Sequence, residues 1–449
     1  MCEIPFFFDY NPNTMATRYI NRKTSRLYSN ETGYSYDFVL IYGEEVQTQS
    51  ASNNGRTKVR YRNKYEGFVN TEDLKTGREL EVYFIDVGQG DAAFIVTPND
   101  TKILIDGGYN ERARGFLAWK YHLANENSPD LVIDLLILSH ADGDHLGGLL
   151  PILQHDKIKV KQIIHNGIGL FKNMDEKSGD LSPNEEFLTT YHSALADLDG
   201  FTLRNEFEDW INLVQQKGIT YQAVHQGTGI FDVGDPEIKI EILGPRLNMH
   251  EGAPQLKWFG NHSHTINGHS VMFKLTYDDV SMLFSGDMNI EGAEYLMEDH
   301  NLTAKLAAHV FKTPHHGSHE FYTPFFEAIR PQISVVSSGD SPDHGHPRAN
   351  FLGAIGLASR SSAPLLFSTE IAGAFVDVNA ADLRNIIPAG ALRQVDLESI
   401  RFFKRQLHGM INVRTDGRQL FAMRRVSASY QWEAYGPLDL APFPSIFGS

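Results

Sequence analysis

Four side chains of types that bind metal ions lie within six residues, at His140, Asp142, Asp144 and His145. They follow an apolar run, residues 131–138, that predicts a buried strand. A tight loop at the end of a strand can direct alternating side chains into one pocket, where His supplies nitrogen ligands and Asp supplies oxygen ligands. The alternative is a solvated acidic loop in which Asp144 caps the next helix. Two His flanking two Asp at this spacing favour the metal site.

Strands and helices alternate around this loop. Short apolar runs bounded by turn residues predict strands, and longer periodic segments predict helices at 112–126, 290–308 and 319–330. Two hairpins are expected, at 270–287 and at 409–424, because each has a turn signal between two apolar halves. The interleaving predicts an α/β or α+β class with substantial sheet.

Differences in composition and in the pattern of apolar runs divide the chain into three segments. Residues 1–78 are polar and rich in Asn, Arg, Lys and Tyr, which predicts a partly irregular N-terminal extension. Residues 79–428 carry the alternating strands and helices of one large domain. A charge-rich helical insertion, expected to hold two helices, occupies about 180–217 of that domain. Residues 429–449 are expected to be a C-terminal tail.

Composition limits the class of protein. The 449 residues are 41% hydrophobic, which allows a large core, and the single Cys excludes a disulfide framework. No apolar run approaches the ~18–20 residues of a membrane helix, and the N-terminus lacks the basic start of a signal peptide, so we expect a cytoplasmic protein with no membrane partner. The net charge of −16 disfavours nucleic acid, but residues 401–426 hold seven basic side chains and one acidic, which weakens that exclusion.

The loop at 140–148 resembles the HxHxDH signature of the metallo-β-lactamase fold, with Asp142 in place of the second His. The HxDxDH variant is similar to the branch that includes the nuclease-like domain of ComEC competence proteins. The resemblance implies a four-layer αββα sandwich with the site at one edge, between the two sheets. Further motifs of that branch occur in order over about residues 80–426: FIDVGQGDAAFI (84–95), ILIDGG (103–108), NGHSVMFKL (267–275), LFSGDM (283–288), FKTPHHGSHEF (311–321), SSGD…HGHP (337–347) and GMINVRTDG (409–417).

The resemblance also implies two divalent metal ions. These ions are expected to be either Zn²⁺ or Mn²⁺, because a mixture of carboxylates and imidazoles suits both. One of His315 and His316 would complete the second metal site; His315 is favoured because it ends the predicted strand, although the sequence leaves both open. His269 lies in a Gly-His-Ser context and is an alternative ligand, whereas His262 and His264 are expected in a surface loop. The candidate ligands are His140, Asp142, Asp144, His145, Asp287, His315, His316 and His269.

Other residues near the expected site have different predicted roles. Asp86 and Asp106 end short strands and are expected to orient metal-binding His residues, or else to cap turns. Asp144 is predicted to position or deprotonate water, and His346 to hydrogen-bond a phosphate oxygen or the leaving group. Lys312 is either a further phosphate contact or a surface Lys at a strand end. The substrate-binding candidates are Ser318, Asn267, Ser270 and Gly339.

These residues and the resemblance favour a metal-dependent hydrolase of phosphodiester bonds, a DNA nuclease or phosphodiesterase in which a hydroxide bridged by two metals attacks phosphorus. The expected partners are nucleic acid or a small phosphodiester. The resemblance further implies an effector module in bacterial defence, beside an ATPase or sensor protein. One alternative is a hydrolase of a thioester, amide or lactone, disfavoured because those branches usually keep His at the position of Asp142. Another is a non-catalytic binding protein on a degenerate fold, disfavoured by the intact ligand set.

Overall fold

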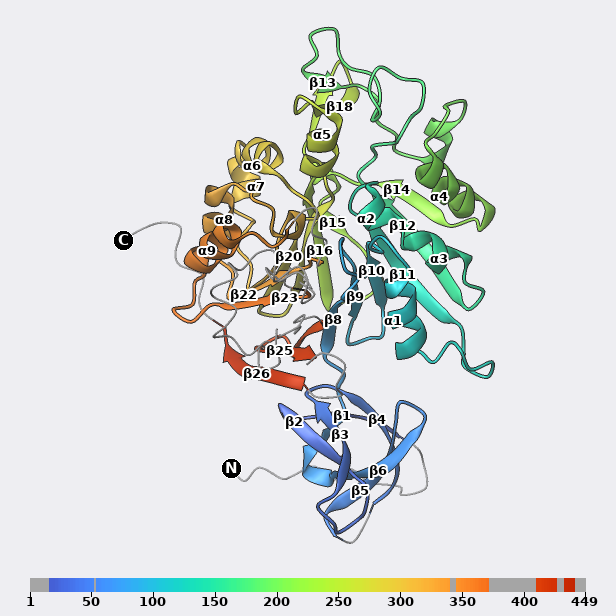
Figure 1. Ribbon diagram of the computed structural model, residues 1–449, viewed down its shortest axis with the longest axis vertical. Coiled ribbons are helices and arrows are strands. Elements are labelled where there is room, and N and C mark those ends of the chain that lie inside the picture. Colours follow the sequence, from blue (N-terminus) through green and yellow to red (C-terminus); the bar gives the residue numbers. More distant parts are fainter. Residues whose placement is uncertain (1–15, 52–53, 340–344, 371–408, 426–431, 441–449) are drawn as a thin grey trace, which may run out of the picture.

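Two β-sheets pack face to face at the centre of the molecule, and helices cover the outer face of each sheet (Figure 1). An apolar layer fills the space between the sheets, where Phe84 and Ile137 from one sheet share a core with Phe273 and Met282 from the other. The arrangement confirms the predicted α/β (α+β) class and the four-layer αββα sandwich. The computed structural model describes residues 16–51, 54–339, 345–370, 409–425 and 432–440.

The first sheet has nine strands. In spatial order they are β14 (Thr220–Ala223), β12 (Ile158–His165), β11 (Leu131–Leu138), β10 (Lys102–Ile105), β9 (Ala93–Val96), β8 (Leu80–Phe84), β24 (Ile411–Thr415), β25 (Gln419–Arg425) and β26 (Trp432–Asp439). The strands from β10 to β14 pair in parallel and the others pair antiparallel. The central strand β11 is apolar at almost every position because both of its faces are covered, as expected for a parallel strand in a layered fold.

The second sheet has seven strands. In spatial order they are β15 (Ile230–Phe231), β16 (Ile238–Gly244), β19 (Met272–Tyr277), β20 (Val280–Phe284), β21 (Val310–Lys312), β22 (Ile333–Val336) and β23 (Leu365–Ser368). The strands from β20 to β23 are parallel. Both predicted hairpins are confirmed, because β19 pairs with β20 and β24 pairs with β25 in antiparallel register.

Helices form the two outer layers. Those on the first sheet are α1 (Arg112–Lys120), α3 (Leu149–Gln154) and α4 (Asn205–Gln216), and those on the second are α6 (Ile290–Met297), α7 (His300–Thr303), α8 (Thr323–Ile329) and α9 (Ala349–Ala358). The predicted helix at 290–308 is thus two shorter helices. Across the described ranges, no helix combines the length and the apolar character that crossing a bilayer would require.

The N-terminal segment corrects the prediction of a partly irregular extension. Residues 16–75 form a separate seven-stranded sheet around a small apolar core that includes Ile20, Leu27 and Val59. Its strands are β1 (Ala16–Ile20), β2 (Thr24–Tyr28), β3 (Tyr36–Ile41), β4 (Glu45–Ala51), β5 (Arg56–Tyr61), β6 (Tyr65–Asn70) and β7 (Leu74–Lys75). The polar texture is misleading because only alternate positions face inward, as the burial pattern of β5 shows.

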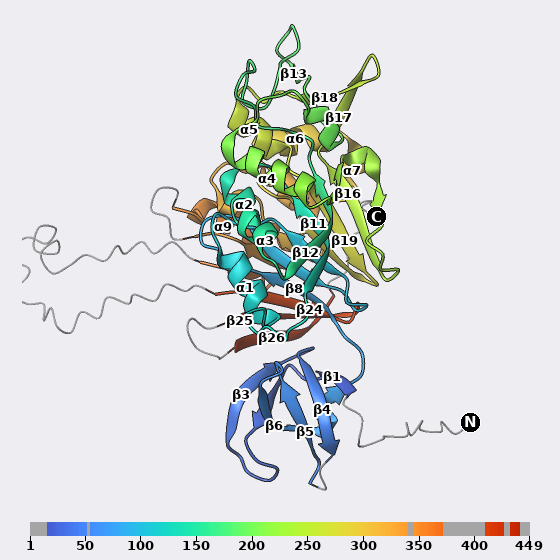
Figure 2. The same ribbon diagram turned by 90° about the vertical axis from the view of Figure 1, so that its right-hand side faces the viewer.

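This N-terminal sheet lies against the end of the sandwich formed by β24 and β25 (Figures 1 and 2). The ring of Tyr42 stacks on that of Phe421, with centroids 3.8 Å apart. The buried Arg414 donates a hydrogen bond of 2.9 Å from Nη1 to the carbonyl oxygen of Tyr42. A stacked pair and a buried guanidinium therefore join the two parts.

Two further segments differ from the predictions. The insertion contains one α-helix, α4, and a 3₁₀ turn at Leu195–Leu198 in place of two helices. Its strand β13 (Phe187–Leu188) joins β18 (Ala253–Lys257) and β17 (Leu247–His250) in a small sheet. The expected C-terminal tail includes β26, which pairs with β25 as the edge strand of the first sheet. The backbone of β26 pairs with β25, and the carbonyl oxygen of Asp439 also accepts a 2.8 Å hydrogen bond from Gln332 Nε2.

Close backbone contacts fix the loop after β11. Gly90, with φ of +110°, packs so closely that a Cβ atom there would lie 2.0 Å from the carbonyl oxygen of Asp144. A Cβ at Gly148 would lie 1.9 Å from the carbonyl oxygen of Gly107. Glycine is required at both positions. The three loops that follow β8, β10 and β11 therefore form one packed unit.

Candidate metal centre

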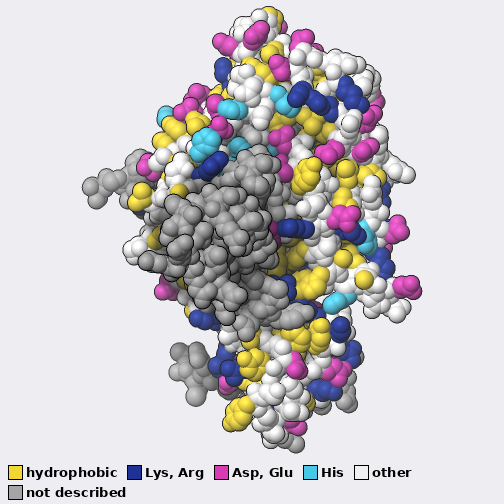
Figure 3. Space-filling model, viewed as in Figure 1, with side chains coloured by type: hydrophobic (Ala, Val, Ile, Leu, Met, Phe, Trp, Pro, Cys, Tyr) yellow, Lys and Arg dark blue, Asp and Glu magenta, His cyan; other side chains and the backbone are white. Residues whose placement is uncertain are grey.

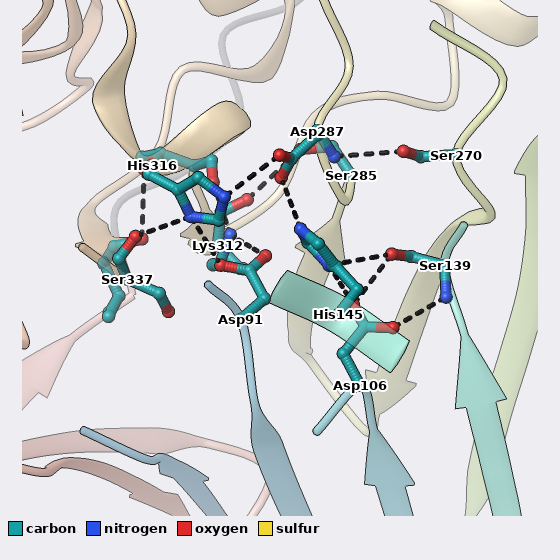
Figure 4. Close-up of polar contacts among 12 residues, drawn as sticks. Asp91, Asp106, Ser139, His145, Ser270, Ser285, Asp287, Lys312, His316 and Ser337 are labelled. Carbon is teal, nitrogen blue, oxygen red and sulfur yellow. Dashed lines mark hydrogen bonds and ion pairs between the residues drawn. The ribbon is translucent and has the colours of Figure 1, made fainter. Parts of the chain in front are cut away.

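The predicted site residues meet at one edge of the sandwich, beyond the carboxyl ends of four strands (Figure 4). Asp106 follows β10 and His145 belongs to the short helix α2 (Gly143–Leu146) after β11. Asp287 follows β20, and His316 follows β21. Because each pair of parallel strands ends at the same edge, residues far apart in the chain come together there.

Each of three imidazole rings is held in place through its Nδ1 atom and directs its Nε2 atom toward the centre. His145 donates from Nδ1 to Asp106 Oδ2 at 2.9 Å, and His316 donates from Nδ1 to the carbonyl oxygen of Ser337 at 3.0 Å. The Nδ1 atom of His140 lies 3.0 Å from Ser139 Oγ. The Nε2 atoms of all three rings are buried and make no well-aligned hydrogen bond with a described residue, although those of His145 and His316 face carboxylate oxygens at 3.0–3.3 Å. Rings tethered through one nitrogen, with the other nitrogen facing a shared centre, are typical of metal-binding His.

Asp287 lies between two of these rings. Its Oδ1 atom is 3.3 Å from His145 Nε2, and its Oδ2 atom is 3.0 Å from His316 Nε2. Asp144 approaches the same nitrogen of His316, with its Oδ2 atom at 3.2 Å. The ligand atoms of these four residues all lie within 4.8 Å of one another. Asp287 therefore lies between the two rings, and its role as a bridge between metal ions stays a prediction.

One side of the centre opens to solvent. Asp142 and Asp144 keep 33% and 26% of their side-chain surface exposed, whereas His145, His316 and Asp287 are almost completely buried. The Asp142 Oδ2 atom lies 3.9 Å from His140 Nε2. The centre is therefore accessible to solvent beside these two carboxylates.

Charge in the centre is unbalanced without a cation. Burial alone would lower the pKa of His145 and His316, but the Asp287 carboxylate beside both rings raises each pKa well above its usual value. Burial and the neighbouring Asp144 raise the pKa of Asp142 to about 7. The clustered carboxylates therefore favour positive charge at this position. The donor set fits divalent metal ions, which would supply this missing positive charge.

Asp91 is a member of the site that the sequence reasoning missed. Its buried carboxylate forms an ion pair with Lys312 Nζ and lies 3.2 Å from His316 Nδ1. The signal was present, since a charged residue at the start of the apolar run DAAFIVT must find a partner. Asp91 holds the His316 ring in the way that was predicted for Asp86.

Two predicted roles are corrected by these contacts. Asp86 lies outside the cluster, where its Oδ1 atom is 3.2 Å from Arg112 Nη1. It accepts a hydrogen bond from the Gly88 N–H, which fits the turn-capping alternative and not the support of a metal-binding His. Lys312 is only 5% exposed and is neutralised by Asp91, so it is neither a surface residue nor free to contact a phosphate. Both corrections follow from burial, which sequence spacing does not reveal.

The choice between the two adjacent His residues is decided by the chain path. His315 and His316 both have positive φ, 47° and 52°, a conformation that costs energy for residues other than glycine. The turn directs His316 into the cluster and leaves His315 outside the group of four ligand atoms. The preference for His315 is therefore corrected in favour of His316.

His269 lies elsewhere, which corrects its candidacy as a ligand. Its ring stacks on Phe259 with centroids 4.7 Å apart, and its Nε2 atom donates to the carbonyl oxygen of Lys257 at 2.8 Å. Both contacts direct the imidazole away from the cluster. The adjacent Ser270 is closer, because its Oγ atom accepts a 3.0 Å hydrogen bond from the Asp287 N–H. Ser270 therefore positions Asp287 and is too deeply buried to contact a substrate, which corrects its predicted role in substrate binding.

The remaining candidates form the walls of the centre. Gly339 packs on the loop after β8, where a Cβ would lie 2.1 Å from the backbone nitrogen of Gln89. Ser318 is buried and its Oγ accepts from the Glu320 N–H at 3.3 Å. These contacts favour structural roles for both. Asn267 and His346 are buried near the site, and the roles assigned to them stay predictions.

Comparison with known proteins identifies the family. The profile of the metallo-beta-lactamase superfamily matches residues 85–339. The chain belongs to the metallo-beta-lactamase superfamily. The superfamily match indicates a hydrolase, and the His and Asp residues of the chain form candidate metal sites.

One similar protein refines this placement. ComE operon protein 3 of Bacillus subtilis (strain 168) is 24% identical over 287 residues, which are 61% of this chain and 30% of that protein. This chain therefore spans less than a third of that relative, and the match confirms the similarity to the competence branch of the superfamily. A solved structure, the mono-zinc form of the metallo-beta-lactamase FIM-1 from Pseudomonas aeruginosa, is 12% identical with a TM-score of 0.18, covering 54% of this chain and 68% of that one.

Metal binding should distinguish His316 from His269 as a ligand. We expect His316→Gln to lose at least one of the metal ions, because its Nε2 atom faces Asp144 and Asp287. His269→Gln should retain the full content, since its ring faces the Lys257 carbonyl. Metal content per chain, measured by mass spectrometry after dialysis against Zn²⁺ or Mn²⁺, checks this. Equal content in both variants would contradict the assignment of His316.

Proposed function

We propose that the protein is a metal-dependent phosphodiesterase that acts on DNA or another phosphodiester. One observation carries the proposal: three imidazole Nε2 atoms, those of His140, His145 and His316, converge with Asp287 beside two partly exposed carboxylates. The high share of carboxylates, with Asp142 where related hydrolases keep a His, suits Mn²⁺ as well as Zn²⁺. The similarity to the competence branch supports a phosphodiester over a thioester, amide or lactone.

The chain's own residues then have distinct tasks. We assign the metal ions to His140, Asp142, Asp144, His145, Asp287 and His316. Divalent ions held there would supply Lewis-acid polarisation of the phosphoryl oxygens. Asp106 and Asp91 keep the rings of His145 and His316 in position. Such buried carboxylate–imidazole contacts preserve the geometry of the centre when a substrate replaces water.

Two further groups are placed to act on the substrate. Asp144 is on the open side and is also within 3.5 Å of Gln89 Nε2, so it can orient the attacking water as well as contact a metal. His346 lies with its ring 6.3 Å from that of His316 and 6.0 Å from that of His315. We propose that His346 donates a proton to the leaving oxygen.

A cleavage assay tests the proposed function. The purified chain, supplied with Mn²⁺, Zn²⁺ or Mg²⁺, should hydrolyse bis-p-nitrophenyl phosphate and single- or double-stranded DNA, and EDTA should stop both reactions. Nitrocefin, a lactone and a thioester are assayed as comparison substrates with the same metal ions. Turnover of one of these three without any cleavage of a phosphodiester would overturn the proposal.

A further inference from the structure

A small cavity lies next to the metal centre, between the two sheets. It leaves about 10 Å³ in which the centre of a water molecule can lie. Part of its wall is apolar and comes from β9 and β10 of the first sheet and from β19 and β20 of the second. The rest of its wall is polar and is formed by Asp91, Asp106, Ser139 and Lys312. A space of this size is large enough for one water molecule.

The polar part of this wall carries charged groups that solvent does not reach. On the face of the molecule that Figure 3 shows, Lys, Arg, Asp and Glu side chains of both signs lie at the surface, where water solvates them. Asp91, Asp106 and Lys312 are instead almost completely buried. Buried polar and charged groups cost free energy wherever one of their donors or acceptors lacks a partner.

Contacts within the protein leave three hydrogen-bonding positions without a partner here. The Lys312 ammonium has three N–H donors, of which one pairs with Asp91 and one donates to the Thr313 carbonyl oxygen at 2.8 Å. The Asp91 Oδ1 atom makes no well-aligned hydrogen bond with a described residue. The Asp106 Oδ1 atom accepts from the Ser139 N–H at 2.7 Å, which leaves it one further acceptor position. One donor and two acceptors are therefore available at the cavity.

The two carboxylates at the cavity support two different imidazole rings of the metal centre. The Asp91 Oδ1 atom lies 3.2 Å from His316 Nδ1. The Asp106 Oδ2 atom accepts from His145 Nδ1 at 2.9 Å. Figure 4 shows each carboxylate below the ring that it contacts. A molecule that hydrogen-bonds both carboxylates would therefore connect the supports of both rings.

A cation is the alternative occupant, because ligand atoms of Asp91, Asp106 and His145 lie within 4.8 Å of one another. Lys312 already places an ammonium at this cavity, and a second cation beside it would be repelled. The Nδ1 atom of His145 also carries the proton that it donates to Asp106, so it offers no lone pair to a metal ion. The occupant must therefore be neutral and must both donate and accept hydrogen bonds, as water does.

We infer that this cavity binds one structural water molecule, which accepts a hydrogen bond from Lys312 and donates to Asp91 and Asp106. The water gives each of the three buried groups its remaining partner. It also connects the supports of His316 and His145, so that one network positions both metal-binding rings. The inference concerns the metal centre and does not depend on which bond the protein hydrolyses.

Substitutions at Ala93, which lines the cavity from β9, test whether the occupant must be polar. Ala93→Val and Ala93→Thr add side chains of nearly equal shape, but only the threonine hydroxyl can replace the hydrogen bonds of the water. Ala93→Val should bind Zn²⁺ about tenfold more weakly than Ala93→Thr, because metal-binding His residues lose affinity when their supports are disturbed. Competition with a chromophoric chelator measures both affinities without any substrate.

Ala422 provides the matched control. It is also a buried alanine on a strand of the first sheet and packs in the same apolar layer, but it does not line the cavity. In EDTA, Ala422→Val should unfold at a higher urea concentration than Ala422→Thr, since a hydroxyl finds no partner in an apolar core. The order should be reversed at Ala93. Greater stability of the valine variant at both positions, or equal metal affinities of the two Ala93 variants, would overturn the inference.

A high-resolution crystal structure of the wild type gives a readout that does not require any variant to fold. Electron density for one water molecule in contact with Lys312, Asp91 and Asp106 is the expected result. A metal ion at this position, identified by its anomalous signal, or a cavity without density would overturn the inference, whether or not the protein cleaves phosphodiesters.

Discussion

Replacing Asp287 by Asn is expected to lower phosphodiester cleavage by about 1,000-fold or more, because several kcal/mol of charge stabilisation depend on the metal ions that this carboxylate would bridge. The two carboxylate oxygens of Asp287 are 3.3 and 3.0 Å from the Nε2 atoms of His145 and His316. Among the described residues, no other carboxylate pairs with both of these Nε2 atoms. An amide has the same shape but carries no charge, and its NH₂ group cannot bind a metal ion.

A readout other than activity is available for the same variant. A ligand that binds only the folded state raises the melting temperature, so Zn²⁺ or Mn²⁺ should stabilise the wild type and not Asp287→Asn. The matched control is Asp235→Asn, which removes another buried carboxylate that hydrogen-bonds Thr97 and Asn99 far from the site. The control should lose stability but keep both the metal-dependent shift and the activity. A normal metal-dependent shift in Asp287→Asn would contradict the bridging assignment.

Replacing Lys312 by Met is expected to lower the free energy of unfolding by about 3–5 kcal/mol, because it leaves a buried carboxylate unpaired. The side chains of Lys312 and Asp91 are 5% and 6% exposed. Among the described residues, the Asp91 carboxylate forms ion pairs with Lys312 and His316. Adding Asp91→Asn should restore much of the loss, since both charges are then absent. Urea denaturation of the single and double variants in EDTA measures the two effects without any contribution from metal.

Lys161 provides the comparison for Lys312. Its Nζ atom lies 2.6 Å from Asp134 Oδ1, but its side chain is 64% exposed, and such surface pairs contribute about 0–1 kcal/mol. Lys161→Met should therefore change stability little. If Lys312→Met were equally harmless and raised KM for a phosphodiester, Lys312 would be the phosphate contact that its position in the sequence suggested, and the structural assignment would be wrong.

Local patterns predicted the parts of the fold that depend on neighbouring residues. The apolar run over 131–138, the hairpins at 270–287 and 409–424, and the metal-binding loop after β11 all occur where expected. Each depends on strand periodicity or on a turn within a few residues, which a sequence displays directly. The N-terminal strands were missed because a small sheet that buries only alternate side chains presents a mostly polar sequence.

The sequence by itself determined which residue types are available for chemistry: a His and Asp loop, a later Gly-Asp, a His-His pair, and ordered motifs that identified the superfamily. Tertiary structure alone decided which of them meet. Positive φ at two consecutive residues directs His316 into the cluster of ligand atoms and leaves His315 outside it. Stacking on Phe259 directs His269 away from the cluster. Asp91, rather than Asp86, holds the His316 ring, and its carboxylate also pairs with the buried Lys312. These choices depend on side-chain direction and desolvation, and both arise only when distant strands share one edge.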